Sequence, residues 1–277
     1  MTSMDERRSP YSLRAPGGRD SDGAPMRLPG RTPFPNVDDH LVQPEVTRDE
    51  IIGGRLVVAL PAKEPHADQH SDLDYVLRAH AAPGYRSSSD LLTRHDIDSD
   101  FASDACLRKE GIDPETGARY LEEIAFEVVS EQNEQDVSEK APRMHRRGVR
   151  RIFAIFVKPR RVCEWSPESR SWRALAPDSR IEDPCLAIPL EVAALLDAAA
   201  ADNAVVEALA AKGNPAIRKR EARGKAEAIL SVLEARGIAV SAPQRQEILR
   251  CADAARLDRW LRRAALAAST EGVLAGS

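Results

Sequence analysis

Residues 120–130 read Tyr-Leu-Glu-Glu-Ile-Ala-Phe-Glu-Val-Val-Ser, and residues 151–157 read Arg-Ile-Phe-Ala-Ile-Phe-Val. Both stretches are short and rich in β-branched and aromatic residues, and the second is almost continuously apolar, which is typical of a strand buried on both faces. The polar residues 132–147 between them are compatible with a helix, and Gly148 is a common helix stop. This order of elements predicts an α/β or α+β fold.

Short elements are also expected on either side of these two strands. Residues 50–60 are rich in β-formers around Gly53-Gly54, which predicts a hairpin. A helix is expected over residues 65–80, a short strand over 103–107, and loops over 87–89 and 108–119. Residues 161–165 and 171–175 predict a second hairpin, in which Trp165 and Trp172 face each other across the strands.

The composition divides the chain into four parts. Residues 1–44 contain seven Pro and four Gly with few aliphatic side chains, which predicts a disordered arm. Residues 45–175 form the expected α/β domain, and residues 176–188, with two prolines and no periodicity, are expected to be a linker. Residues 189–277 predict a helical module, with one helix from Pro189 to about Lys212, a second capped by Asn214 and a third with a capping box at Ser241.

Charge and cysteine usage exclude several classes of protein. The net charge of −4 gives no global attraction to nucleic acid, so any basic surface has to be local. The four cysteines form no Cys-x-x-Cys pair, which excludes a zinc ribbon, a thioredoxin motif and a disulfide scaffold. No stretch approaches the roughly 20 apolar residues of a membrane helix. We therefore expect a soluble cytoplasmic protein with no membrane partner.

Two acidic residues stand in apolar surroundings. Asp104 lies in the short strand candidate, and Glu127 lies between Phe126 and Val128 in the best strand. An unpaired carboxylate on a core strand is costly, so Glu127 should be paired, bound to a metal or placed at the sheet edge. Two carboxylates on neighbouring strands can hold Mg²⁺ or Mn²⁺. A Glu that faces solvent or an arginine is the simpler alternative.

Basic residues follow immediately. Asp136 and Lys140 are spaced to share one face of the expected helix. Lys140 begins a run to residue 161 that holds nine Lys or Arg and no Asp or Glu. Such a run can neutralise DNA phosphates, although a solvated surface also explains it. Five members of this run are the candidate DNA contacts: Arg143, Arg146, Arg147, Arg150 and Arg151.

The order of these motifs resembles the Uma-type restriction endonuclease family of the PD-(D/E)XK nuclease superfamily. The resemblance covers about residues 45–175 and rests on five stretches of sequence: Asp49–Val57, Ser103-Asp104, Phe126–Ser130, Asp136-x-x-x-Lys140 and Gly148–Ile155. It implies a restriction-endonuclease-like mixed sheet flanked by helices, here followed by the all-helical C-terminal module.

The resemblance also implies roles for individual residues. Asp104 and Glu127 match the two metal-binding acids, and the carbonyl of Val128 would complete the metal shell. Lys140 matches a catalytic lysine displaced onto the helix, since Val129 stands where the superfamily usually has lysine. Glu50 matches the acid of the first hairpin, a further candidate catalytic group, while Ser130 and Asp136 match structural positions.

Two functions therefore remain open. The first is a metal-dependent endonuclease, a hydrolase that cuts DNA phosphodiester bonds with Mg²⁺ or Mn²⁺. The alternative is a catalytically inactive nuclease fold that binds nucleic acid or another partner. The helical module is a candidate homodimer surface in either case.

Two further groups of residues are not expected to be functional. His66 and His70 lack a third ligand at metal-binding spacing, which argues against a zinc site. Lys219, Arg220 and Arg223 form a second basic patch, for which a solvated helix face is the expected role.

Overall fold

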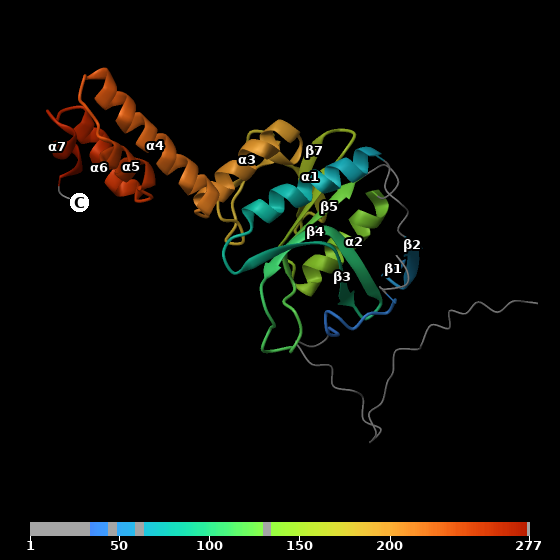
Figure 1. The fold of residues 1–277 in the computed structure, drawn as a ribbon. Coiled ribbons are helices and arrows are strands. Elements are labelled where there is room, and N and C mark those ends of the chain that lie inside the picture. Colours follow the sequence, from blue (N-terminus) through green and yellow to red (C-terminus); the bar gives the residue numbers. More distant parts are fainter. Residues whose placement is uncertain (1–33, 44–48, 59–63, 130–133, 276–277) are drawn as a thin grey trace, which may run out of the picture.

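Strand β5 (Glu122–Val129) lies inside a mixed sheet of eight strands, in the computed structural model that describes residues 34–43, 49–58, 64–129 and 134–275 (Figure 1). The strand order is β2-β1-β4-β5-β6-β7-β8, and β3 also pairs with β4. The other strands are β1 (Asp49–Ile52), β2 (Arg55–Val58), β3 (Tyr85–Asp96), β4 (Ser99–Lys109), β6 (Arg151–Phe156), β7 (Arg161–Ser166) and β8 (Ser171–Ala174). The mixed α/β fold expected from the sequence is confirmed.

The β5 and β6 strands pair in parallel, whereas the other neighbouring strands of this sheet pair antiparallel. Parallel neighbours need a crossover connection, and here it is α2 (Glu134–Arg147). The helix ends before Gly148, which has φ +122°, a value that favours glycine. Helix α2 therefore runs from the end of β5 that holds Glu127 back to the start of β6.

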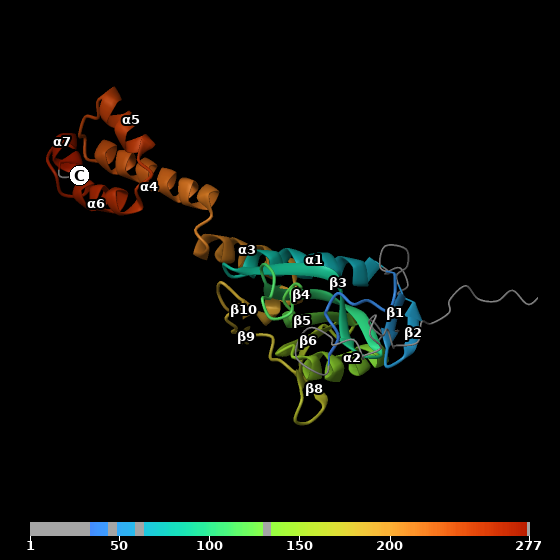
Figure 2. The same cartoon turned by 90° about the horizontal axis from the view of Figure 1, so that it is seen from below.

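Helices cover both faces of the sheet (Figure 2). Helix α1 (Glu64–His80) buries Leu73, Val76 and Leu77 against one face, together with Phe126 and Val128 of β5. Helix α2 buries Ala141 and Met144 on the other face, against Ala125 and Ile152. Because side chains alternate along a strand, Glu127 shares the α2 face with Ala125. The sheet thus carries a carboxylate inside its own core.

The two predicted hairpins are confirmed. β1 and β2 pair around Gly53-Gly54, with φ +57° and +76°. β7 and β8 place Trp165 opposite Trp172, with ring centroids 5.3 Å apart in an edge-on arrangement.

Strand β3 was not predicted. Its first half carries Ser87, Ser88, Ser89 and Asp90, residues with little preference for strands, and we expected a loop over 87–89. Pairing with β4 over almost the whole length of β3 overrides that preference. Asp90 has φ +48°, so the strand is irregular opposite Asp104.

The expected linker and the start of the helical module need correction. Residues 176–188 include β9 (Arg180–Ile181), which pairs with β10 (Leu190–Glu191), and Ile181 and Cys185 are buried in the α1-side core. The expected helix from Pro189 is instead β10, the short helix η1 (Val192–Leu195) and α3 (Ala198–Ala211). Because α3 buries Ala201, Val205 and Ala208 in the same core, it packs with the sheet.

The remaining helices have a core of their own. They are α4 (Pro215–Ala235), α5 (Ala242–Arg250), α6 (Ala254–Ala264) and α7 (Thr270–Leu274). The predicted Asn214 cap and Ser241 capping box are both present. Ile229, Leu233, Leu257 and Trp260 are buried in this second core, which lies away from the sheet at the far end of α4 (Figures 1 and 2). We call residues 214–275 the helical unit.

The expected arm is described in part. Residues 1–33 lie outside the described residues, whereas residues 34–43 pack on the sheet domain. Val37 is buried and its carbonyl accepts from the Arg94 amide, while the Leu41 amide donates to Asp100 at 2.6 Å. The segment 34–43 is therefore part of the folded domain, because it covers the buried Asp100.

No helix within the described ranges is both long and apolar enough to cross a membrane.

A buried histidine makes stability depend on pH. His95 is 2% exposed and stacks on Phe101, with ring centroids 4.2 Å apart. Burial lowers the pKa of His95 well below its usual range, and the charges of Arg147, Lys140 and Arg119 lower it further. The unfolded chain therefore binds a proton near pH 6.5 that the folded chain does not, so stability falls as the pH drops below about 6.5.

The His95→Phe variant should lose this dependence. Between pH 6.5 and 5.5 we expect the wild-type protein to lose about 1 kcal/mol more unfolding free energy than the variant. Urea unfolding at several pH values measures the difference. Parallel pH profiles for the two proteins would contradict this role of His95.

Candidate active site

Lys140 is the centre of the candidate site. Its side chain is 9% exposed, and its Nζ lies 3.0 Å from Glu50 Oε2, 3.6 Å from Glu127 Oε2 and 2.9 Å from the Ala102 carbonyl oxygen. These partners come from β1, β5 and β4, while Lys140 itself comes from α2. Burial lowers the pKa of Lys140, but the carboxylates of Glu127, Glu50 and Asp104 outweigh it, so the pKa lies above its ordinary value. Lys140 is therefore a buried cation.

Glu127 is the most buried acid of the group. Its side chain is 2% exposed, and Oε1 has no hydrogen-bond partner among the described residues. Burial raises the pKa of the Glu127 carboxyl well above its usual range; Lys140 lowers it, whereas Asp104 and Glu50 raise it. A buried carboxyl oxygen without a partner is unfavourable, so this atom is a candidate ligand for a cation.

Glu50 joins the first hairpin to this group. Its Oε1 accepts from the Ala102 amide at 2.9 Å, while the same carboxylate accepts from Lys140. The hairpin is also tied to α2 by Arg55, which pairs with Asp136 at 2.7 Å and with Glu139 at 3.0 Å. Asp136 thus links the hairpin to the helix. Ser130, its expected companion, lies outside the described residues.

Asp104 lies on β4 next to the other acids. β4 and β5 pair antiparallel with Ala105 opposite Phe126. One residue further along, Asp104 therefore lies opposite Glu127. Its Oδ2 accepts from the Val128 amide at 2.5 Å. The register therefore brings Asp104, Glu127 and Val128 to one point of the sheet, and α2 and β1 bring Lys140 and Glu50 there.

A second set of possible metal ligands shares Asp104. His70, Asp90 and Asp104 each offer a ligand atom, and these atoms lie within 4.8 Å of one another. Hydrogen bonding to Asp90 raises the pKa of His70 to about 9 despite burial. The other ring nitrogen of His70 lies 3.5 Å from Asp74, which in turn accepts from the Ser89 hydroxyl. A carboxylate behind a histidine orients the ring in many metal sites.

The sequence did not predict this second set. Asp90 lies on the unpredicted strand β3, and His70 was considered only with His66. The one sequence signal for this set is the four-residue spacing of His70 and Asp74, which places both on one helix face. That spacing indicates a metal site only once β3 is known to bring Asp90 beside His70.

The five arginines proposed for DNA binding all have partners within the chain. Arg146 pairs with Asp96 at 2.6 Å, Arg150 with Glu123 and Asp183, and Arg151 with Glu164. Arg143 and Arg147 donate to the carbonyls of Glu139 and Pro35. The structure does not bring Arg150 or Arg151 to Glu127: Arg151 pairs with Ile124 at the start of β6, whereas Glu127 pairs with Ala154.

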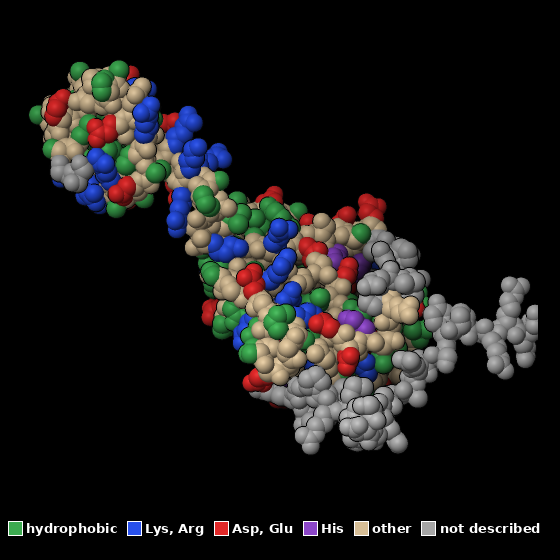
Figure 3. Space-filling view, turned by 60° about the horizontal axis from the view of Figure 1, so that its bottom comes forward, with side chains coloured by type: hydrophobic (Ala, Val, Ile, Leu, Met, Phe, Trp, Pro, Cys, Tyr) green, Lys and Arg blue, Asp and Glu red, His purple; other side chains and the backbone are tan. Residues whose placement is uncertain are grey.

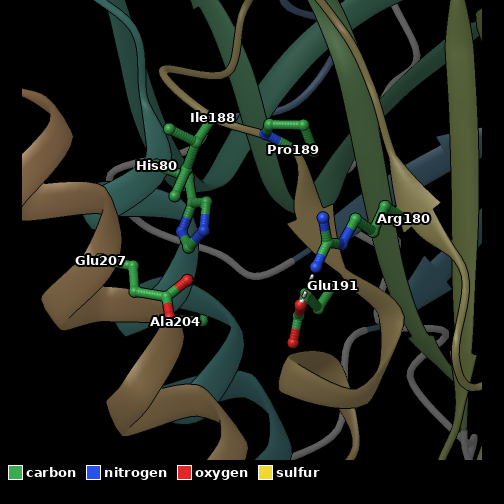
Figure 4. Close-up of a pocket in the computed structure, with 7 residues that line it drawn as sticks. All are labelled: His80, Arg180, Ile188, Pro189, Glu191, Ala204 and Glu207. Carbon is green, nitrogen blue, oxygen red and sulfur yellow. Dashed lines mark hydrogen bonds and ion pairs between the residues drawn. The ribbon is translucent and has the colours of Figure 1, made fainter.

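A small pocket lies elsewhere, between α1, α3 and the β9–β10 pair (Figure 4). It has a volume of about 160 Å³ and contains His80, whose Nδ1 bonds the Val76 carbonyl and whose Nε2 has no partner among the described residues. Arg180 and Glu191, which both line this pocket, form an ion pair at 2.8 Å. None of the expected site residues lines this pocket.

The donor set around Lys140 suits a hard divalent cation. Magnesium and manganese prefer carboxylate and carbonyl oxygens, and Mg²⁺ needs only one or two carboxylates. The unpartnered Glu127 Oε1 is an oxygen of this kind, and Asp104 lies on the neighbouring strand. The residues present therefore fit the cation that the sequence resemblance implies.

Comparisons with known proteins add little. No protein-family model matches this chain, and neither does any curated protein. Among solved structures, one from Anabaena variabilis ATCC 29413, described as "a putative nuclease belonging to DUF820", is similar with a TM-score of 0.45 and 16% sequence identity. The match covers 53% of this chain and 89% of that one. Similarity at this level assigns neither a family nor an activity to this chain, so its function has to be inferred from the site.

Proposed function

We propose that this protein is a metal-dependent endonuclease that hydrolyses phosphodiester bonds in DNA. The observation that supports it best is the buried group of Lys140, Glu50 and Glu127, in which one carboxylate oxygen has no partner among the described residues. A fold that needed only an apolar core would not keep three ionisable groups there, because burying them is costly. Hydrolysis of a phosphodiester would give Lys140, Glu50 and Glu127 a role each, as charge stabiliser, positioning group and metal ligand.

The proposed cation is Mg²⁺ or Mn²⁺, held by Asp104, Glu127 and the Val128 carbonyl. When bound, such an ion activates a water molecule and polarises the phosphate. His70 and Asp90 offer a second way to hold a cation through Asp104. The two arrangements predict different effects of changing His70.

The protein's own groups supply charge and position. Lys140 stays positive near neutral pH, so it can stabilise the negative charge that grows on the scissile phosphate. Glu50 positions Lys140 by holding its ammonium group and the Ala102 amide at once. Contacts between Arg143–Arg151 and the DNA backbone remain a prediction, and they would require these arginines to exchange their present partners for phosphates.

A second candidate function is a catalytically inactive nuclease fold that binds a partner. The observation that favours it is the saturation of Lys140, whose ammonium group already contacts two carboxylates and a carbonyl. In such a protein these contacts would be purely structural.

Plasmid cleavage tests the proposal. Wild-type protein should nick supercoiled DNA with Mg²⁺ or Mn²⁺ and not with EDTA. Asp104→Asn and Glu127→Gln should each lower the rate by at least about 100-fold, as expected for groups at the reacting centre. Asp178→Asn makes the same chemical change at an exposed aspartate outside the candidate site, so it is the control and should leave the rate unchanged.

Metal binding gives a readout that does not depend on cleavage. Titration calorimetry with Mn²⁺ should show binding that Glu127→Gln weakens at least about tenfold. Weaker binding in His70→Gln together with unchanged binding in Glu127→Gln would instead assign the cation to the His70–Asp90–Asp104 set. Metal-independent cleavage would contradict the proposed role of the cation. No cleavage with intact DNA binding would contradict the proposal and support the inactive fold.

A further inference from the structure

Positive charge is concentrated in the C-terminal part of the chain. Residues 214–277 hold twelve Lys or Arg and seven Asp or Glu, a net charge of +5. Residues 1–213 hold twenty-eight Lys or Arg and thirty-seven Asp or Glu, a net charge of −9. The acidic overall balance therefore hides a basic segment attached to a strongly acidic domain.

Much of this positive charge lies on the first half of α4. Figure 3 shows Lys and Arg side chains gathered along the narrow part of the molecule that joins the sheet domain to the helical unit. Residues 215–224 carry four basic residues and one acid: Arg218, Lys219, Arg220, Glu221 and Arg223. All five side chains are exposed.

The packing of the helical unit leaves this half of α4 uncovered. Lys225 pairs with Asp258 in the first half of α6 at 2.7 Å. Arg236 donates to the carbonyl of Ala264, the last residue of α6, and to that of Ala267 beyond it. Helix α6 thus lies along the second half of α4. Ala222 is the single buried residue between 215 and 225.

Three of the cations share a face. At 100° per residue, Lys219, Arg220 and Arg223 fall within about 100° of the helix circumference, and Lys219 and Arg223 are separated by a rise of about 6 Å. Lys219 and Arg220 have no ion-pair or hydrogen-bond partner among the described residues. Arg223 pairs with Glu227 at 2.8 Å, but both side chains are largely exposed, at 75% and 55%. Exposed pairs of this kind contribute little, so a phosphate can replace the glutamate.

We infer that the face of α4 carrying Lys219, Arg220 and Arg223 binds the phosphate backbone of duplex DNA. Free, clustered, exposed cations are what sequence-independent backbone binding requires. The arginines at 143–151, the alternative surface, are engaged with carboxylates and carbonyls of the chain itself. We choose DNA among possible polyanions because of the proposed function. The location of the binding face is inferred only from the exposed charges of α4.

Fluorescence anisotropy on the full-length protein tests this inference. The probe is a fluorescein-labelled 25-base-pair duplex of mixed sequence, without added divalent metal, at 50 to 200 mM NaCl. The Lys219→Gln/Arg220→Gln variant removes two charges from the face. The matched control, Arg86→Gln/Arg173→Gln, removes two exposed charges from the sheet domain.

The α4 variant should weaken binding at least about fivefold and lower the slope of log K against log salt by nearly 2, or about 0.9 per lost phosphate contact. The control should change the affinity less than twofold. Equal weakening in both variants, or no change in the α4 variant, would overturn the inference. So would salt-sensitive binding to phosphatidylserine vesicles that depends on Lys219 and Arg220 when DNA binding does not.

This test is separate from the cleavage test. Asp104→Asn should abolish cleavage and keep the anisotropy signal, whereas Lys219→Gln/Arg220→Gln should weaken the signal and raise the protein concentration needed for half-maximal cleavage. If Asp104→Asn cleaves DNA like the wild-type protein while Lys219→Gln/Arg220→Gln still weakens the anisotropy signal, the proposed nuclease site is wrong and the DNA-binding face is supported.

Discussion

Replacing Lys140 with methionine is expected to lower the free energy of unfolding by about 3 to 5 kcal/mol, the usual range when one partner of a buried ion pair is removed. Methionine fills a similar volume, so the loss comes from charge. Glu50 and Glu127 would then face each other in the core without the ammonium group that now lies 3.0 and 3.6 Å from them. Urea unfolding measures the loss.

A second substitution should restore much of that stability. In Lys140→Met/Glu127→Gln one uncompensated carboxylate is gone, so we expect recovery of at least half of the loss, with cleavage still absent. Lys225→Met is the matched control, since Lys225 pairs with Asp258 at the surface and its removal should change stability by about 1 kcal/mol or less. Equal stability of the single and double variants would contradict the buried charge network.

Replacing Trp260 with alanine is the second large expected effect. Trp260 is 1% exposed and is the largest side chain in the core of the helical unit. Truncating such a residue costs about 3 to 5 kcal/mol. The total free energy of unfolding of a unit of this size is only slightly larger than this loss. The variant should therefore unfold α4–α7 while the sheet domain stays folded.

Hydrogen exchange read by mass spectrometry on peptides can show this division. Peptides from α4 and α6 should exchange rapidly in Trp260→Ala, whereas peptides from α1 and β5 should keep their protection. Trp172→Ala is the control, because Trp172 lies at the β7–β8 hairpin and packs with Phe156 and Trp165. Equal loss of protection in both parts would show that the two cores unfold together.

Much of the fold could be predicted from local pattern. β5, β6 and both predicted hairpins carry strong β-formers or turn residues, and the caps of α4 and α5 are visible in the sequence. Strand β3 could not be predicted, because Ser87, Ser88 and Ser89 become a strand only through pairing with β4. The segment around Ile181 and Leu190 was missed for a similar reason, since its two-residue strands are stabilised by the core beneath them.

The candidate site was accessible to sequence reasoning only in part. Glu127 was proposed from its apolar surroundings, and the roles of Lys140 and Glu50 were proposed from a resemblance. The β-sheet pairing and α2 bring the three residues together. The pairing of Arg146, Arg150 and Arg151 with carboxylates could not be predicted, because their partners lie 13 to 50 residues away along the chain. Charge counting finds cations, but only three-dimensional contacts show which of them are free.

The contact between Glu50 and Lys140 spans 90 residues. Closing a loop of that length is entropically less favourable than forming α2 or pairing β4 with β5, so this contact should form after the local structure during folding. The candidate centre also needs the first hairpin, which contributes one of its acids from the outer part of the sheet. A growing or partly folded chain can therefore hold its central strands and still lack a complete set of charges. Under the proposed function, hydrolytic competence would arise last and be lost first.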